Sequence, residues 1–131
     1  MRPVDHASFQ RWLDDYVEAW RTYDEDAIGA LFSEEASYRY HPWDEGGESA
    51  QGRTAIVAGW LADRDEPGSW SATYRPWAIE GDRAVATGVS RYFGADARTV
   101  VREYHNVFLC RFDDEERCYE FTELYLERKS P

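Results

Sequence analysis

The chain has 131 residues, 43% of them hydrophobic and 16% aromatic, which is enough to bury the core of one domain spanning residues 1–131. A formal net charge of −11 without any basic stripe argues against nucleic acid as a partner, because an acidic surface repels phosphate backbones. The sequence has no apolar signal segment and no run approaching the ~20 residues of a membrane span, so we expect a soluble, cytoplasmic protein with no membrane partner.

Three helices are predicted in the first half of the chain. The first rests on six side chains that form one continuous helical stripe: Phe9, Trp12, Leu13, Tyr16, Val17 and Trp20. A short second helix follows Thr22 or Asp24, either of which could cap it, and turns four apolar side chains inward: Ala27, Ile28, Leu31 and Phe32. A third helix runs from about Thr54 to Arg64.

The remaining segments predict strands and their connections. Residues 36–42 alternate and stop at Pro42, and residues 44–49 have the composition of a loop. Long strands follow at 71–80, 83–93, 99–112 and 118–127, with an acidic turn at 113–116 between the last two. An antiparallel sheet with its helices gathered on one face accommodates this order, so the predicted fold class is α+β.

Several features of the sequence are similar to one known superfamily. They are the element order, the strand Tyr38-Arg-Tyr-His-Pro42 before the helix start Gly52-Arg-Thr-Ala-Ile56, and the ending from Phe112 to Tyr125. Over essentially the whole chain they resemble the SnoaL-like branch of the nuclear transport factor 2-like superfamily. The resemblance implies a cone-shaped, cystatin-like α+β roll, in which a curved sheet wraps around the first helix and encloses a pocket. It also implies a homodimer formed through the outer face of the sheet.

This superfamily contains enzymes with unrelated reactions, among them ketosteroid isomerases, scytalone dehydratases, limonene-epoxide hydrolases and polyketide cyclases. Its fold therefore does not determine the function. Limonene-epoxide hydrolases depend on an Arg-x-Asp pair on a central strand. That pair falls on Gly88 and Ser90 in this sequence. The sequence therefore excludes the epoxide-hydrolase mechanism.

Strand alternation selects the side chains that face the predicted pocket. A four-residue turn at 113–116 pairs Phe112 with Arg117 and sets Asn106 opposite Glu123. The face shared by the last two strands then carries one carboxylate among mostly aromatic neighbours: Tyr104, Asn106, Phe108, Cys110, Tyr119, Phe121, Glu123 and Tyr125. A slip of one residue would turn Glu103 and His105 inward instead, and the sequence leaves that alternative open.

Glu123 is the predicted catalytic residue. A carboxyl group among apolar side chains is desolvated, which raises its pKa and suits general acid or base chemistry. Asn106 and three tyrosines would donate hydrogen bonds to a substrate carbonyl or enolate: Tyr38, Tyr40 and Tyr104. The competing interpretation is structural, with Glu123 bonded to a neighbouring tyrosine or paired with an arginine such as Arg39, Arg75 or Arg91.

Two further catalytic candidates are Tyr38 and His41, the latter because it stands beside Pro42 at a strand end, where it could act as a base at the pocket mouth. The residues predicted to line the pocket are Tyr16, Trp20, Tyr40, Trp43, Trp60, Tyr92, Tyr104, Asn106, Phe108 and Phe121. The three histidines lack metal-ligand spacing and no phosphate-binding glycine motif occurs, so we expect neither a metal nor a cofactor.

Two functions of different kinds fit these residues. One is a cofactor-independent isomerase, cyclase or dehydratase acting on a small hydrophobic molecule, and the other is a non-catalytic domain that binds such a ligand or serves as a dimeric scaffold. A homodimer is favoured by apolar side chains on the predicted outer face: Val101, Val107, Leu109, Leu124 and Leu126. Cys110 and Cys118 flank the last hairpin, where we expect reduced thiols.

Overall fold

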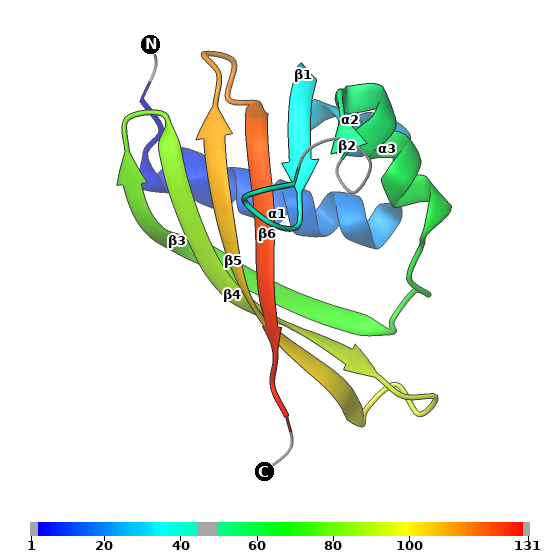
Figure 1. Ribbon diagram of the computed structural model, residues 1–131. Helices are drawn as coiled ribbons and strands as arrows, with labels where there is room; N and C mark the ends of the chain where they lie inside the picture. Colours follow the sequence, from blue (N-terminus) through cyan, green and yellow to red (C-terminus); the bar gives the residue numbers. More distant parts are fainter. Residues whose placement is uncertain (1–2, 45–49, 130–131) are drawn as a thin grey trace.

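The computed structural model describes residues 3–44 and 50–129 and contains three helices and six strands within them (Figure 1). In chain order the elements are α1 (His6–Thr22), α2 (Glu25–Ala30), β1 (Phe32–Arg39), β2 (Ala50–Gln51), α3 (Arg53–Ala62), β3 (Trp70–Glu80), β4 (Arg83–Phe93), β5 (Val100–Phe112) and β6 (Cys118–Glu127). The predicted loop at 44–49 lies, except for Asp44, outside the described residues.

The strands form one curved sheet in the order β2-β1-β6-β5-β4-β3. All neighbouring pairs are antiparallel except β1 and β6, which run parallel. Figure 1 shows α1 crossing one face of the sheet, with α2 and α3 gathered beside β1 and β2. The predicted α+β class, with three helices packed on a mainly antiparallel sheet, is confirmed.

Local sequence signals explain where the first two helices begin. The Asp5 side chain accepts from the Ser8 backbone N–H at 2.7 Å, and Ser8 Oγ accepts from the Asp5 N–H at 3.1 Å, which satisfies two amide groups at the start of α1. Of the two candidate caps for α2, the structure uses Asp24, whose side chain accepts from the backbone N–H groups of Asp26 and Ala27.

The core lies between α1 and the inner face of the sheet and is built mainly from rings. Trp12 occupies its middle and contacts the rings of four phenylalanine or tyrosine neighbours in addition to Phe9: Tyr16, Phe32, Phe112 and Phe121. Gly88 on β4 is required by this packing, because a Cβ atom there would lie 2.1 Å from Thr73 O and 2.4 Å from Tyr74 Cδ1. Both cysteines, Cys110 and Cys118, are free and buried in the same core.

Strand β1 starts earlier than predicted, at Phe32 rather than at residue 36, so Phe32 belongs to the strand and not to the second helix. Its side chain is fully buried all the same, because it continues the apolar face that Ile28 and Leu31 begin. The strand also ends earlier, at Arg39, which places Tyr40 to Pro42 in the following turn. This shift decides where His41 and Trp43 lie.

The hairpin of β5 and β6 has a different register from the predicted one. Phe112 pairs with Cys118 rather than with Arg117, and beyond an irregularity at Arg111 the pairing of Asn106 moves from Glu123 to Tyr125. The displacement is two residues, so the residues of both strands that face inward beyond the irregularity are those predicted. Within the irregularity the alternation breaks, since an extra residue in one strand rotates the residues after it.

Two sequence-based predictions about this end of β6 are therefore wrong. Strict alternation in the last strand would turn Cys118 to the face opposite Phe121 and Glu123, but Cys118 pairs with Phe112 and is fully buried in the core. Tyr119, predicted to share the pocket face, instead donates its hydroxyl to Asp82 Oδ2 at 2.7 Å, beside Arg111. Both differences result from the bulge in β6. The extra residue between Cys118 and Glu120 reverses the inward and outward alternation, so Cys118 does not follow the pattern that holds from Phe121 onward.

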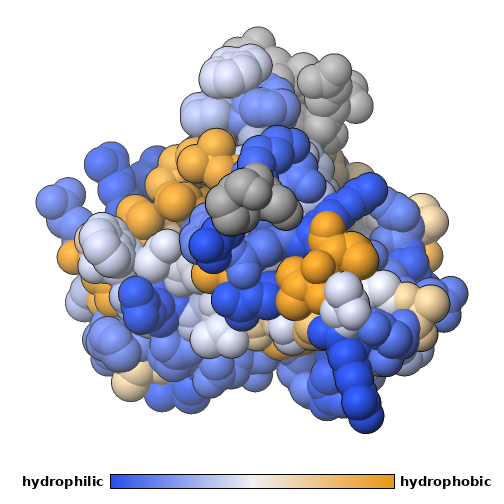
Figure 2. Space-filling model, turned by 90° about the horizontal axis from the view of Figure 1, so that it is seen from below, coloured by the Kyte–Doolittle hydropathy of each residue, from blue (hydrophilic) through white to orange (hydrophobic). Residues whose placement is uncertain are grey.

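Viewed from below, the surface is mainly hydrophilic, and its hydrophobic residues are confined to separate patches (Figure 2). This agrees with a composition that holds 26 acidic and 15 basic residues. Among the described residues, no helix is long and apolar enough to cross a membrane.

Candidate active site

A cavity of about 810 Å³ opens between α1, α3 and the inner face of strands β4 to β6. Nine of the residues proposed from the sequence line it: Tyr16, Trp20, Tyr38, Tyr40, Trp60, Tyr92, Tyr104, Asn106 and Glu123. They come from the C-terminal half of α1, from β1 and the turn after it, from α3 and from three strands. The fold thus brings together side chains that lie more than a hundred residues apart in the sequence.

Four other candidates do not line the cavity. Phe108 and Phe121 are fully buried beneath it, where their rings lie 5.3 and 5.6 Å from the ring of Tyr16, so they support the pocket wall from behind. Trp43 is 75% exposed and stacks on His41, with ring centroids 5.0 Å apart. Both His41 and Trp43 leave the pocket because β1 ends at Arg39 and the chain turns away from the sheet.

A buried carboxylate fixes that turn. Asp44 is 5% exposed and accepts hydrogen bonds from the backbone N–H groups of Tyr40 and His41, at 3.2 and 2.9 Å. Its other oxygen lies 3.2 Å from His41 Nδ1. The His41 side chain is therefore part of a local turn that Asp44 holds together, and the structure gives it no place among the groups that line the pocket.

Glu123 projects from β6 into the cavity and takes part in a chain of hydroxyl groups. Tyr38 donates its hydroxyl to Glu123 Oε2 at 3.0 Å, and the Tyr38 and Tyr16 oxygens lie 3.1 Å apart. Because the Tyr38 proton is directed at the carboxylate, Tyr16 is the donor to Tyr38. Burial raises the pKa of Glu123 to about 7, and the hydrogen bond from Tyr38 opposes this rise.

Arginine does not neutralise Glu123, although the sequence leaves that alternative open. Within the part of the chain that the structure describes, Glu123 forms no ion pair. Arg39 lies 3.6 Å from Glu120 and Arg91 lies 2.8 Å from Glu103, so both are engaged elsewhere, and Arg75 is exposed on β3. The half of the structural interpretation that does hold is the hydrogen bond to tyrosine.

Asn106 and Ser90 form a second buried polar group in the pocket wall. Ser90 Oγ donates to Asn106 Oδ1 at 3.1 Å, and the two residues are only 3% and 4% exposed. Since the amide oxygen is occupied, the Asn106 NH₂ group remains as a donor toward the cavity that both residues line. The sequence predicted Asn106 but not Ser90, whose importance depends on the cross-strand position of β4.

Three tyrosine hydroxyls near Glu123, those of Tyr16, Tyr38 and Tyr40, remain protonated at neutral pH. Burial and then the charge of Glu123 raise the pKa of Tyr40 to about 12. The same two causes, in the same order, raise the pKa of Tyr16 and of Tyr38 well above its ordinary value. These groups are therefore hydrogen-bond donors at the site and not bases.

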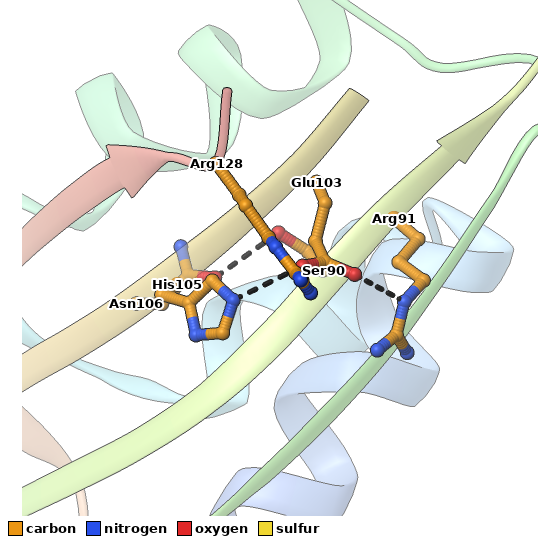
Figure 3. Close-up of polar contacts among 6 residues, drawn as sticks. All are labelled: Ser90, Arg91, Glu103, His105, Asn106 and Arg128. Atoms are coloured by element: carbon orange, nitrogen blue, oxygen red, sulfur yellow. Dashed lines mark hydrogen bonds and ion pairs between the residues drawn. The ribbon is translucent and has the colours of Figure 1, made fainter. Parts of the chain in front are cut away.

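Glu103 and His105, which a one-residue slip would have turned inward, lie on the outer face. Figure 3 shows Glu103 between three donors. His105 Nε2, Arg91 Nε and Arg128 Nη1 lie 3.1, 2.8 and 3.2 Å from its carboxylate oxygens. Their hydrogen bonds lower the pKa of Glu103 to about 2. The register is therefore the one that places Glu123 and Asn106 in the pocket.

Several lining residues are not among those that the sequence predicts in the pocket: Tyr23, Asp63, Asp65, Ser90, Val101 and Arg102. Asp63 and Asp65 belong to an acidic cluster with the composition of an exposed helix end, and only the folded chain shows that this end borders the cavity. Val101, predicted on the outer face, lies at the pocket mouth because β5 is irregular where Phe93 pairs with Val100. Among the described residues, no group of three or more potential metal ligands comes together.

Most of the pocket residues lie in a segment that matches one known protein family. The model of the SnoaL-like domain matches residues 13–120, which is most of the chain. The protein belongs to the SnoaL-like domain family. No curated protein matches the chain in sequence.

Solved structures share the fold of this SnoaL-like protein at low sequence identity. A protein of Kribbella flavida, provisionally named a ketosteroid isomerase, has a TM-score of 0.65 and 17% identity, over 97% of this chain and 84% of its own. A Sinorhizobium meliloti protein, provisionally named a polyketide cyclase, has a TM-score of 0.59 and 20% identity, over 92% of this chain and 99% of its own. A protein from Novosphingobium aromaticivorans, provisionally named a scytalone dehydratase, has a TM-score of 0.68 and 12% identity, over 95% of this chain and 87% of its own. At these identities the likeness extends to the fold alone.

Proposed function

We propose that this SnoaL-like protein is a cofactor-independent enzyme that moves a proton at a carbon atom next to a carbonyl group in a small, largely hydrophobic substrate. The observation that carries the proposal is Glu123, a partly buried carboxylate without an ion pair among the described residues, whose pKa is about 7. A base with a pKa near the working pH combines a substantial ionised fraction with adequate basicity. The hydroxyl of Tyr38 keeps the carboxylate oriented.

The reaction follows from the donors around Glu123. Ionised Glu123 takes a proton from the carbon, and the electron pair of the broken C–H bond moves to the carbonyl oxygen, giving an enolate. The Asn106 NH₂ group and the hydroxyl of Tyr40 line the same cavity and would donate hydrogen bonds to that oxygen. In a ketone with a β,γ-double bond the enolate extends to a dienolate, so protonated Glu123 can return the proton to the γ-carbon, which completes an isomerisation without any other reactant.

The enolate has two other outcomes, and they correspond to the provisional names of the similar structures. Attack of the enolate carbon on an electrophile in the same molecule closes a ring, and loss of a β-hydroxyl group, with the proton on Glu123 leaving with it as water, is a dehydration. The names isomerase, cyclase and dehydratase all occur among proteins with this fold. The first step is common to all three, so we propose that step and leave the outcome to the substrate.

The common first step can be tested without knowing the product. In deuterated water, reversible enolate formation exchanges the carbon-bound hydrogen for deuterium, and mass spectrometry detects the exchange in a panel of cyclic enones, steroid ketones and aromatic polyketide-like ketones. We expect the wild-type protein to catalyse exchange in at least one compound and Glu123→Gln to be about 10²- to 10⁴-fold slower. Glu103→Gln, a carboxylate of the outer face, is the matched control and should exchange at the wild-type rate.

Two results would contradict the proposal. Equal exchange by Glu123→Gln and wild type would mean that another group is the base. Ligand-dependent thermal stabilisation of the wild type without any exchange in the compounds that stabilise it would favour the alternative, a non-catalytic domain that binds a hydrophobic ligand.

A further inference from the structure

Three rings set at angles to one another line one part of the pocket, which we call the aromatic corner: Trp20, Tyr92 and Tyr104. The ring centroids of Trp20 and Tyr92 lie 6.3 Å apart at 54°, and those of Tyr92 and Tyr104 lie 5.9 Å apart at 85°. Trp20 is itself held from behind by Trp70, stacked at 3.5 Å and 9°. All three rings are partly exposed and line the cavity.

A carboxylate is fixed beside these rings. Trp20 donates its indole N–H to Asp65 Oδ2 at 3.0 Å, and the Asp65 backbone N–H donates to the Tyr23 hydroxyl at 2.8 Å. The second carboxylate oxygen of Asp65 has no hydrogen bond within the described residues. Burial raises the pKa of Tyr92, and the charges of Asp65 and then Glu123 raise it further. Asp63 also lines the cavity.

Within the described part of the chain, no arginine or lysine makes a cation–π contact with the three rings of the aromatic corner, and the guanidinium of Arg64 lies instead over the neighbouring Tyr23 ring at 5.5 Å. The cavity is lined by three carboxylates and one basic residue, Arg102. Arg102 pairs with Tyr92 across the strands but is exposed and forms neither an ion pair nor a cation–π contact there. The negative charge of Asp65 and the partly exposed rings are therefore both available to a ligand.

We propose that the aromatic corner binds an ammonium group of the ligand, protonated or quaternary, against the ring faces of Trp20, Tyr92 and Tyr104, with Asp65 as its counter-charge. Faces of aromatic rings attract cations, and a desolvated contact contributes about 2 kcal/mol or more. The inference deepens the proposed function and rests on it, since it identifies the substrate of the same pocket as a carbonyl compound that also carries an amine.

The sheet sets the spacing between the two parts of such a substrate. Glu123 pairs with Phe108 on β5, and Tyr104 lies four residues farther along that strand. Four residues of an antiparallel strand span roughly 13 Å. The ammonium group and the reacting carbon should therefore be separated by a linker or ring system of about that length.

The experiment compares three probes of similar shape and different charge: benzyltrimethylammonium, neutral neopentylbenzene and anionic phenylmethanesulfonate. Binding is followed by the indole N–H resonance of Trp20, which reports on the corner itself and needs no catalysis. We expect the cation to bind about tenfold more tightly than the neutral probe, within the range that cation–π contacts give. We expect the anion to bind most weakly, because the lining carries an excess of carboxylates.

Variants separate the charge from the rings. Asp65→Asn keeps an oxygen that accepts from Trp20 and should lower the affinity for the cation about tenfold, with no change for the neutral probe. Asp63→Asn removes an equal charge that does not bond to Trp20, and we expect a smaller loss. Tyr92→Phe preserves the ring and should bind the cation nearly as well as wild type, whereas Tyr92→Leu should lose most of the preference.

Equal affinity for the cation and the neutral probe would overturn the inference, as would no binding of the cation up to about 10 mM, which corresponds to negligible affinity. Preference for the anion, lost in Arg102→Gln, would also overturn it and would identify an acid-binding pocket instead. Glu123→Gln should lower the affinity for the cation less than Asp65→Asn does, because Glu123 bonds to Tyr38 and not to a ring of the aromatic corner. A protein that binds the cation but exchanges no hydrogen would contradict the proposed function alone, so the two failures are distinguishable.

Discussion

Glu123 and Glu103 lie on neighbouring strands of one sheet but on its opposite faces. On the outer face, Glu103 receives hydrogen bonds from two arginines and a histidine, and its pKa falls to about 2. On the inner face, Glu123 receives one hydrogen bond from a neutral tyrosine, and burial raises its pKa to about 7. The same residue type therefore carries a fixed charge on one face and a proton that can be exchanged near neutral pH on the other.

The difference shows what to look for in a structure whose chemistry is not established. A carboxylate surrounded by cations is already neutralised and contributes to structure, whereas one held by a neutral donor in a cavity retains capacity for proton transfer. The two faces also provide matched controls for each other. Each face can therefore be altered while the other serves as its reference.

The first prediction, with the largest expected effect, concerns the pH dependence of the exchange reaction. If Glu123 acts as the base, kcat/KM rises with pH until the carboxylate is ionised at about pH 7, and it falls tenfold for each pH unit below. Between pH 7 and pH 5 the ionised fraction falls from about one half to about one hundredth, so we expect a loss of about 50-fold, measured as deuterium incorporation in buffers of constant ionic strength. Glu103→Gln should give the same profile, because Glu103 faces away from the cavity.

A profile that rises as the pH falls would show that protonated Glu123 acts first, as a general acid. That outcome would contradict carbon deprotonation as the initial step.

The second prediction is that the two carboxylates make stability depend on pH in opposite directions. The folded protein raises the pKa of Glu123 from 4.5 to about 7, so the folded state favours the protonated form. The contribution of Glu123 to the free energy of unfolding is fully present below about pH 4.5 and is lost as pH rises toward 7. Glu123→Gln removes this loss. The difference in the free energy of unfolding between the variant and wild type should therefore shift by ~1–3 kcal/mol in favour of the variant as the pH is raised from 4 to 8.

For Glu103 the sign is reversed. Its pKa is lowered in the folded protein from 4.5 to about 2, so its contribution is present above pH 4.5 and is lost as pH falls toward 2. Glu103→Gln should be less stable than wild type at pH 7, and the difference should disappear in acid. Urea denaturation at a series of pH values measures both, and parallel curves for the two variants would contradict the contrast.

The third prediction concerns the Tyr38 hydroxyl, the hydrogen-bond donor that distinguishes Glu123 from a carboxylate in a purely apolar site. Tyr38→Phe eliminates a hydrogen bond that lowers the pKa of Glu123, so that pKa should rise above about 7 and the pH–rate profile should shift upward. At pH 7 we expect a rate several-fold below wild type. The substitution also leaves the buried Tyr16 hydroxyl without its partner, which costs about 1–3 kcal/mol of stability.

Tyr16→Phe is the control for this prediction. It removes the outer link of the hydroxyl chain but keeps the Tyr38–Glu123 bond, so the profile should stay close to that of wild type. An equal shift in both variants would mean that the chain acts through packing and not through the hydrogen bond to Glu123.

The parts of this contrast that the sequence predicts depend on periodicity. The helical stripe from Phe9 to Trp20 specifies α1, and strand alternation assigns Glu123 and Asn106 to one face even though the register differs by two residues. An even displacement preserves the faces, and that is why the catalytic candidate is in the cavity.

The parts that the sequence does not predict depend on local interruptions and on distant contacts. The bulge near Phe112 turns Cys118 inward and Tyr119 toward Asp82, and no periodic pattern signals it. The turn held by Asp44 removes His41 from the pocket through side-chain bonds to the backbone. Asp65 reaches the pocket only because it bonds to the indole of Trp20, a residue 45 positions away.

The outer face leads to the last prediction, which has the smallest expected effect, a factor of two in mass. Val107 and Leu124 pair across β5 and β6 on this face, and Leu126 is 78% exposed. Exposed apolar side chains on a long sheet favour self-association with a two-fold axis, because each copy then covers the same patch on the other. We therefore expect a homodimer at micromolar concentration, measured by light scattering.

Val107→Asp places a charge in the middle of this patch and should yield a monomer that still binds ligands in the pocket, since the side chain faces away from the cavity. Arg91→Ala is the informative companion, because it disturbs the Glu103 cluster at one end of the same face without adding a charge to the apolar part. Its dimer should persist. A monomeric wild type would contradict the predicted dimer. The proposed chemistry of the inner face would then stand without any association through the outer face, whose side chains would serve only the ion pairs of the sheet.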